Sequence, residues 1–202
     1  MTPRLHLARD RRVSTWKNGG GVTSEIAIFP PDATIADFDW RVSIADVRDG
    51  GPFSNFPDVD RVLAVLEGTI VLEIAGEAAV TLVPGSDPVT FPGDIPCRAE
   101  IPHGDAKDLN VMTRRGRFSS HMMVMKADGP IPIPANACTI ILVALSDLTI
   151  QIGKKAIALK SLDALQFDAP MPEESRLRCD QPESKGLCIV QLFRVCSALR
   201  AF

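Results

Sequence analysis

The sequence has little that would place the protein at a membrane or on nucleic acid. No apolar run approaches the roughly 18 residues that a membrane-spanning helix needs, and the first residues, MTPRLHLARDRRVS, contain no apolar stretch of signal-peptide length. The formal net charge is −3, so there is no basic excess of the kind that binds nucleic acid or anionic lipid. We therefore expect a soluble, cytoplasmic protein that contacts neither nucleic acid nor membranes directly.

Motifs for metal binding, disulfides and nucleophilic catalysis are also missing. Five cysteines form an odd set without a C-x-x-C pair, so we expect reduced thiols rather than a disulfide framework or a zinc site. The three histidines, His6, His103 and His121, are never two residues apart, although two imidazoles on one face of a strand require that spacing. Ser54 lacks the G-x-S-x-G context of an activated serine. The sequence therefore predicts no metal, no cofactor and no identifiable catalytic residue.

Short alternating or β-branched runs dominate the chain, and few segments show a helical period. Sixteen prolines and fourteen glycines fall mostly between these runs, where the missing N–H of proline does not interrupt a strand ladder. This pattern predicts an all-β fold, a sandwich or barrel with few or no long helices. The expected strands cover residues 22–29, 40–47, 61–67, 69–74, 78–83, 89–91, 97–101, 108–113, 118–126, 138–145, 148–152, 163–168 and 187–196.

The segment GPIPIPAN, residues 129–136, marks a candidate internal boundary. Its closely spaced prolines are typical of a linker or of an edge strand. We expect residues 1–128 to form one β unit and residues 129–202 to form a second unit packed against it. A single long strand that crosses at an edge explains the segment equally well.

The stretch STWKNGGGVTSEIAIF, residues 14–29, places three glycines directly behind Lys17 and Asn18. A Walker-type phosphate loop needs its lysine after the glycines and a helix next, whereas here the lysine comes first and a strand follows. A turn or bulge would require one or two glycines. Three in a row also allow a ligand or another chain segment to approach the backbone closely, so we interpret this loop as the lip of a site.

Polar side chains recur at every second position in three otherwise apolar strands. Residues two apart in a strand point to the same face, so each set can line one side of a sheet. A solvated outer face and a polar pocket both explain this pattern, but three such strands near one glycine lip favour a pocket. The sets are Thr23 and Glu25 in VTSEIAIF, Arg41 and Ser43 in WRVSIADV, and Asp108, Asn110, Met112 and Arg114 in DLNVMTR.

Glu25 would need a cation nearby if it lies inside a barrel, because an unpaired buried carboxylate costs several kcal/mol. Arg41, Arg61 or Lys17 could supply that cation. The remaining cations would then be free for an anionic ligand, and arginine offers the bidentate geometry that a carboxylate prefers. A purely structural salt bridge between Glu25 and Arg41 explains these two residues equally well, and both interpretations stay open.

Three segments carry a family resemblance, and they occur in order between residues 14 and 117: WKNGGGVTSEIAIFP, DFDWRVSIADVRDGGPFSNFPDVDRVLAVLEG and FPGDIPCRAEIPHGDAKDLNVMTRRG. They resemble the signature segments of the HutD/Ves family, double-cupin proteins linked to bacterial histidine utilisation. The resemblance implies a cupin-like double β-barrel, or bicupin, with the recognisable motifs in the first barrel. Beyond Phe118 the resemblance is thin.

The resemblance and the missing catalytic motifs together favour a non-catalytic binding protein. It would bind a small anionic ligand of the urocanate, N-formylglutamate or formate class and modulate histidine utilisation. The expected ligand-binding residues are Lys17, Asn18, Glu25, Arg41, Ser43, Arg61, Asn110, Met112 and Arg114.

Two alternatives stay open. The first is a metal-independent cupin enzyme, an isomerase, epimerase or hydrolase, in which Glu25 is the general base and Arg41 or Lys17 holds the substrate's carboxylate. The second is a protein–protein interaction module, which apolar surface exposed on the strands of residues 118–145 would favour. The same strands could also form a homodimer.

Overall fold

The computed structural model describes residues 3–16, 19–168, 177–181 and 186–195. Its regular structure is β throughout, apart from one short 3-10 helix, η1 (Ala8–Asp10). The predicted all-β class is therefore confirmed. Within the described ranges, no helix has the length and apolar character needed to cross a membrane.

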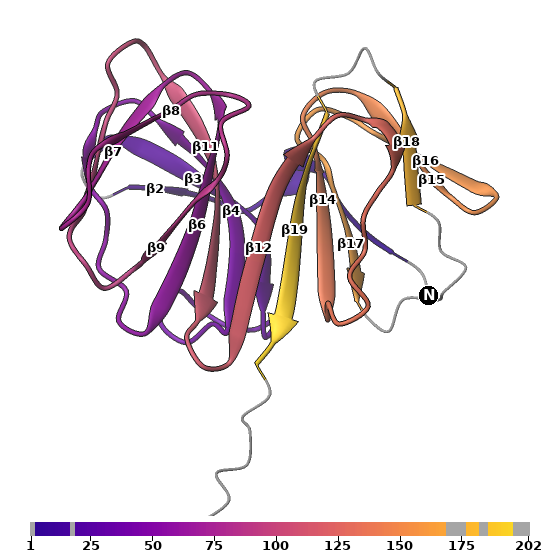
Figure 1. Cartoon of the computed structure of the whole chain (residues 1–202), viewed down its shortest axis with the longest axis horizontal. Coiled ribbons are helices and arrows are strands. Elements are labelled where there is room, and N and C mark those ends of the chain that lie inside the picture. The colour runs from indigo at the N-terminus through magenta and orange to yellow at the C-terminus, as the bar shows by residue number, and fades with distance from the viewer. Residues whose placement is uncertain (1–2, 17–18, 169–176, 182–185, 196–202) are drawn as a thin grey trace, which may run out of the picture. The chain divides into compact units, whose positions relative to one another are not determined.

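The described residues gather into two compact units (Figure 1). Residues 12–119 and Val195 form what we call the N-terminal unit, and residues 3–11 and 120–194 form the C-terminal unit. Each unit contains two antiparallel sheets, and each sheet runs from one edge strand to another without closing within the described residues. The closed double barrel and the boundary at residues 128 and 129 stay predictions.

The N-terminal unit consists of a six-stranded and a four-stranded sheet. In spatial order the six-stranded sheet contains β2 (Val13–Thr15), β3 (Gly21–Phe29), β4 (Trp40–Val47), β11 (Ala106–Arg114), β6 (Val59–Glu67) and β9 (Val89–Pro92). The four-stranded sheet contains β5 (Gly51–Pro52), β10 (Cys97–Glu100), β7 (Ile70–Ile74) and β8 (Val80–Leu82).

The C-terminal unit repeats this plan with a five-stranded and a four-stranded sheet. The five-stranded sheet contains β1 (Arg4–His6), β17 (Ala164–Asp168), β14 (Thr139–Ala144), β19 (Leu187–Arg194) and β12 (Phe118–Met125). The other contains β13 (Asp128–Pro130), β18 (Leu177–Asp180), β15 (Leu148–Ile152) and β16 (Lys155–Leu159).

The core of the N-terminal unit defines the inner face of its six-stranded sheet. Leu63 and Val65 of β6 and Phe91 of β9 belong to one buried cluster with Leu72 of β7 and Ala99 of β10. Since these residues come from both sheets, the face that carries Leu63 is the one that packs against the four-stranded sheet. We call it the inner face.

Strand register places the polar residues of three strands on this inner face. On β11, Met112 lies opposite Arg41 of β4 on one side and opposite Arg61 of β6 on the other. Asn110 is paired in the same way with Ser43 and with the core residue Leu63. Because directly opposed residues point to the same face, all of these side chains face inwards.

The glycine lip is closed by a tryptophan from its own loop. The Trp16 indole N–H donates a hydrogen bond to Thr23 Oγ1 at 2.8 Å, and the buried Gly20 carbonyl accepts hydrogen bonds from the Arg48 and Asp49 N–H groups. A Cβ atom on Gly21 would lie 3.2 Å from the Trp16 ring and 2.5 Å from the Asp46 carbonyl oxygen. Gly21 is therefore needed for close approach, and the ring covers the end of β3 that leads to Glu25.

We expect Gly21→Ala to lower the free energy of unfolding by about 1–3 kcal/mol, because the added methyl group displaces either the backbone of β4 or the Trp16 ring. Gly129→Ala is the matched control, since a Cβ atom there meets nothing within 4 Å, and its effect should stay within about 0.5 kcal/mol. Urea unfolding followed by tryptophan fluorescence measures both. Equal effects at the two glycines would contradict the close-approach argument.

Candidate functional site

Six side chains on the inner face of the N-terminal unit form what we call the inner-face polar cluster. They come from four adjacent strands, β3, β4, β11 and β6, and they lie among apolar neighbours. The cluster consists of Glu25, Arg41, Ser43, Arg61, Asp108 and Asn110.

Glu25 and Arg41 form a partly buried ion pair. Arg41 Nε lies 2.7 Å from Glu25 Oε2, and the side chains are 12% and 25% exposed for arginine and glutamate respectively. A β-bulge between Glu25 and Ala27 shifts the register of β3 directly after the glutamate, and bulges of this kind re-aim side chains near functional sites. Of the three cations considered from the sequence, Arg41 is thus the described partner of Glu25, and the pair is neutral overall.

Arg61 is a buried cation held between two aromatic rings. Its residue is 5% exposed, and its guanidinium carbon lies 4.4 Å from the Phe53 ring centroid and 5.3 Å from that of Phe91. Burial lowers the pKa of Arg61 to about 10, while the negative charge of Asp108 acts in the opposite direction. The guanidinium therefore stays protonated at neutral pH. Its Nε atom is buried and makes no hydrogen bond to any described residue.

Asp108 is the buried carboxyl group of the cluster. Its residue is 2% exposed, and Oδ1 has no hydrogen-bond partner in the described part of the chain. Burial raises the pKa of Asp108 to about 7; the positive charge of Arg61 opposes this rise and the negative charge of Asp46 adds to it. Asp108 is thus an acid that changes its charge close to neutral pH.

The cluster leaves three buried polar atoms unsatisfied: Arg61 Nε, Asp108 Oδ1 and Asn110 Oδ1. Each unmade buried hydrogen bond costs about 1–3 kcal/mol, so such groups are rare in native structures unless they serve a purpose. One of the three atoms is a charged donor and two are acceptors. The arrangement can therefore bind a small polar molecule that offers an anionic oxygen to Arg61.

The structure brings together five of the nine residues expected from the sequence: Glu25, Arg41, Ser43, Arg61 and Asn110. Lys17 and Asn18 lie outside the described residues. Met112 is buried in an apolar cluster with Phe38 and Val59, so it packs the end of the inner face.

Arg114 makes structural contacts at the end of β11. Its guanidinium donates hydrogen bonds to the carbonyl oxygens of Pro57, Ala36 and Phe38 at 3.3–3.4 Å, and it lies over the Phe38 ring at 5.6 Å. These contacts hold a loop in place and leave Arg114 outside the cluster as we define it. Its role as a ligand-binding residue stays a prediction.

Sequence reasoning left Asp108 out of the expected site, although the same alternation that selected Asn110 also selects Asp108. The two phenylalanines that hold Arg61 could not be found in this way, because Phe53 lies in a loop and Phe91 lies on an edge strand. The pairing of β9 with β6 places Phe91 directly opposite Arg61, and the Phe53 ring reaches the guanidinium from the loop after β5. Trp16 is likewise placed by a turn and not by strand periodicity.

Two of the three histidines, His6 and His121, take part in structural hydrogen bonds. His6 belongs to β1, and its Nε2 lies 2.9 Å from Gln166 Oε1. His121 Nδ1 lies 3.3 Å from Gln191 Oε1. Within the described ranges, no group of three histidine, cysteine, aspartate or glutamate side chains is arranged to hold a metal ion.

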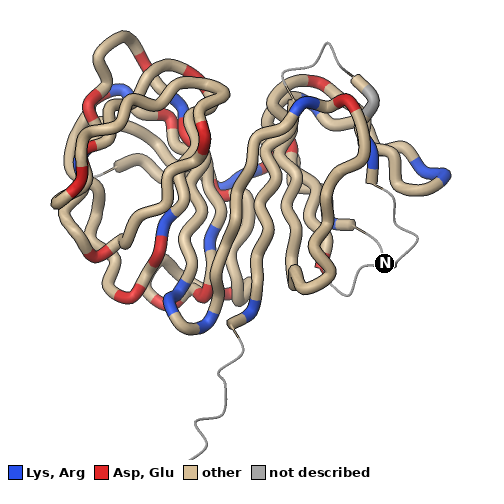
Figure 2. The backbone as a smooth tube through the Cα atoms, viewed as in Figure 1, with Lys and Arg blue, Asp and Glu red and all other residues tan. Residues whose placement is uncertain are grey.

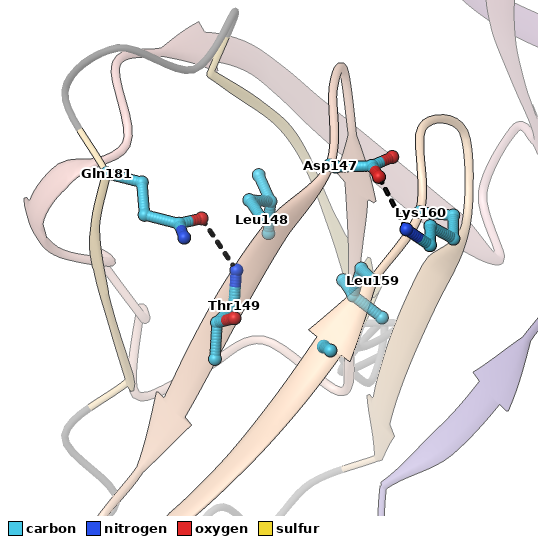
Figure 3. A pocket seen from close by; sticks show the side chains of 7 residues that line it. Asp147, Leu148, Thr149, Leu159, Lys160 and Gln181 are labelled. Atoms are coloured by element: carbon cyan, nitrogen blue, oxygen red, sulfur yellow. Dashed lines mark hydrogen bonds and ion pairs between the residues drawn. The ribbon is translucent and has the colours of Figure 1, made fainter.

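A shallow surface pocket of about 210 Å³ lies in the C-terminal unit, next to the β15–β16 hairpin (Figure 3). Its polar groups already have partners: Lys160 Nζ lies 2.7 Å from Asp147 Oδ2, and Gln181 Oε1 accepts a hydrogen bond from the Thr149 N–H at 2.8 Å. The hydrogen bond from Lys160 lowers the pKa of Asp147. These contacts stabilise the hairpin, and the pocket offers a ligand no unpaired polar group of this set.

The fold and the cluster define a class of protein: an all-β, cupin-like protein with a polar site inside one of two similar units. The chain belongs to the HutD family, whose model matches residues 8–187. Protein Ves of Citrobacter koseri is 41% identical over 117 residues, which is 57% of this chain. That match spans 60% of the length of Ves, so the two proteins are compared over little more than half of either chain.

Solved structures extend the similarity over nearly the whole chain. HutD of Pseudomonas fluorescens SBW25, solved in a formate condition, is 27% identical with a TM-score of 0.77 and covers 96% of this chain and 99% of its own. A conserved protein of unknown function from Pseudomonas aeruginosa PAO1 has 27% identity and a TM-score of 0.81, and covers 96% and 100%. A variant of oxalate decarboxylase from Bacillus subtilis, 9% identical with a TM-score of 0.60, covers 94% of this chain and 76% of its own and is similar in fold alone.

We expect the free energy of unfolding to fall as pH rises from about 4 to about 7 because of Asp108. Its folded pKa of about 7 lies above the unfolded value of about 3.9, so in this interval the folded protein holds a proton that the unfolded chain releases. The contribution of Asp108 to the free energy of unfolding is fully present below about pH 4, falls as pH rises, and is lost above about pH 7.

Urea unfolding of wild type and Asp108→Asn between pH 4 and 8 tests this expectation. The difference between the two proteins should change with pH by up to about 4 kcal/mol, and Asp49→Asn, at an exposed loop position, should leave the wild-type slope intact. A slope that survives in Asp108→Asn would mean that another group titrates.

Proposed function

We propose that this protein binds a small carboxylate in the inner-face polar cluster without transforming it, and that it modulates histidine utilisation through that binding. In this proposal the two units correspond to the two barrels of a bicupin, and only the N-terminal unit carries the ligand. The observation that carries the proposal is Arg61, a desolvated cation with an unsatisfied Nε atom.

Charge balance within the cluster supports an anionic ligand. Glu25 and Arg41 neutralise each other at 2.7 Å, so Arg61 is the cation that an incoming carboxylate can meet. A charge-assisted hydrogen bond to a buried guanidinium is among the strongest that a protein offers. Asp108 and Asn110 present unsatisfied acceptor oxygens on the same inner face, so a ligand that also carries an N–H group could satisfy both kinds of atom.

Similar proteins support the class of ligand. HutD of Pseudomonas fluorescens was solved in a formate condition, and formate is the smallest carboxylate. The link to histidine utilisation comes from membership of the HutD family. Within that link, the candidate ligands are urocanate, N-formylglutamate and formate.

One observation favours an enzyme as the second candidate. Asp108 has a pKa of about 7, which is the range in which a general acid or base works best at neutral pH. Glu25, the base expected from the sequence, is instead held by Arg41. Product formation from a bound acid, abolished by Asp108→Asn and unaffected by chelator, would replace the binding proposal with a metal-independent enzyme.

The interaction-module alternative lacks the observation that would have favoured it. Large exposed apolar side chains occur at Leu5, Val13, Ile35, Val83 and Val195. In the described part of residues 118–145 no large apolar side chain is exposed to this degree. A homodimer stays a prediction that these residues do not address.

We expect at least one of urocanate, N-formylglutamate and formate to raise the melting temperature in a thermal-shift screen. A ligand at 100 times its Kd adds about 2.7 kcal/mol, which corresponds to about 5–10 °C for a chain of this size. Arg61→Met should weaken binding about ten- to hundredfold, because it removes the charged donor while keeping an apolar stem between the two rings.

Arg98→Met is the matched control for this experiment. Arg98 lies exposed on β10, between the inward-facing Cys97 and Ala99, so its substitution should leave the ligand-induced shift unchanged. Each titration is repeated with chelator to separate direct binding from binding through a metal. No shift with any of the three acids, or an equal loss in both arginine variants, would contradict the proposed site.

A further inference from the structure

We infer that anion binding in the inner-face polar cluster is linked to the uptake of one proton by Asp108. The inference rests on the proposed function and adds a form of regulation to the same site. With this linkage the protein would hold its ligand more tightly in acidic than in alkaline conditions.

The two carboxyl groups of the cluster, those of Glu25 and Asp108, differ in their partners. Glu25 forms an ion pair with Arg41 at 2.7 Å. Asp108 makes no ion pair with any described residue, and its Oδ1 atom is buried without a hydrogen-bond partner. A buried carboxyl group that lacks such a partner is stable in its neutral form, and the charged form gains only the more distant attraction of Arg61.

The charge of the site depends on this one proton. When Asp108 is ionised, its charge cancels that of Arg61, and an incoming anion meets a site that is neutral overall. When Asp108 is protonated, Arg61 is left as a net positive charge. In a desolvated interior the repulsion between an anion and a second carboxylate is strong, so the bound anion favours protonated Asp108.

No other charged group described near Asp108 accounts for this change in the net charge of the site. Asp46 acts on Asp108 from β4 and is held by Lys107 in an ion pair. Cys97 of β10 acts on Arg61, but burial raises the pKa of its thiol to about 11, so it stays neutral. The charged groups that act on Asp108 are Arg61 of β6 and Asp46 of β4, and Arg61 is in turn influenced by Cys97 of β10 and Arg41 of β4.

Isothermal titration with N-formylglutamate between pH 5.5 and 8.5 tests the inference. Its carboxyl groups are fully ionised in this range, so the charge of the probe stays constant. We expect a constant Kd at the acidic end and a Kd that rises about tenfold per pH unit above the pKa of Asp108. Titrations in buffers of different ionisation enthalpy should show an uptake that approaches one proton per ligand at the alkaline end.

Two variants test whether Asp108 is the residue that takes up the proton when the ligand binds. Asp108→Asn keeps the shape of the side chain and should make the Kd independent of pH. Asp46→Asn should keep a pH-dependent Kd with its midpoint at a lower pH, because it removes a charge that raises the pKa of Asp108. Proton uptake by the wild-type protein is a readout that does not require either variant to fold.

Three results of these titrations distinguish the linkage, its assignment to Asp108 and the binding proposal. Binding with a flat pH profile would overturn the linkage and leave the binding proposal intact. A pH dependence that persists in Asp108→Asn would overturn the assignment to this residue. No binding of N-formylglutamate at any pH, together with no thermal shift by urocanate or formate, would overturn the proposed function and the linkage with it.

Discussion

The desolvated guanidinium of Arg61 is the constraint on which the site depends. A cation at 5% exposure is stable only because Phe53 and Phe91 place their ring faces against it and Asp108 supplies a nearby acidic group. Gly93 belongs to the same arrangement, since a Cβ atom there would lie 3.4 Å from Arg61 Cδ and 3.0 Å from the Val59 carbonyl oxygen. The residues around Arg61 thus stabilise its positive charge and leave space for its side chain.

The two units follow one architectural plan and fill it differently. In the C-terminal unit, Ile140, Leu142, Leu165 and Phe167 of the five-stranded sheet join an apolar cluster with residues of the facing sheet. In the N-terminal unit, the corresponding interior contains two arginines and two acids. Basic and acidic residues otherwise lie mostly in loops and at strand ends, with both signs interspersed (Figure 2). The N-terminal unit thus buries charges of both signs on the inner face of a sheet. The buried carboxylate of the C-terminal unit, Asp163, instead accepts hydrogen bonds from the Ala8 and Lys160 N–H groups.

Much of the fold follows from the sequence, because alternation and proline–glycine punctuation are local signals. The strands β3, β4, β7 and β19 were predicted to within about two residues, and strand alternation alone placed Arg41, Ser43 and Asn110 on a shared face. The short strands β1, β2 and β5 were not predicted, because they are too brief to show a period. β1 and β5 form by pairing with the distant strands β17 and β10, and β2 forms by pairing with β3. The raised pKa of Asp108 could not be predicted from the sequence either, because it depends on how deeply the folded protein buries the carboxyl group and on the position of Arg61.

Glu25 and Asp108 are both acids on one face of one sheet, but they differ in exposure and in their partners. Glu25 is 25% exposed as a side chain and has a guanidinium at 2.7 Å, so it has both contact with solvent and a direct partner. Asp108 is the most deeply buried acid of the cluster, at 2% exposure, and it has neither contact with solvent nor a direct partner for Oδ1. Two carboxyl groups in one site can thus serve separate purposes, one fixing the position of Arg41 and the other setting the charge that a ligand meets. Environment, and not residue type, divides these roles.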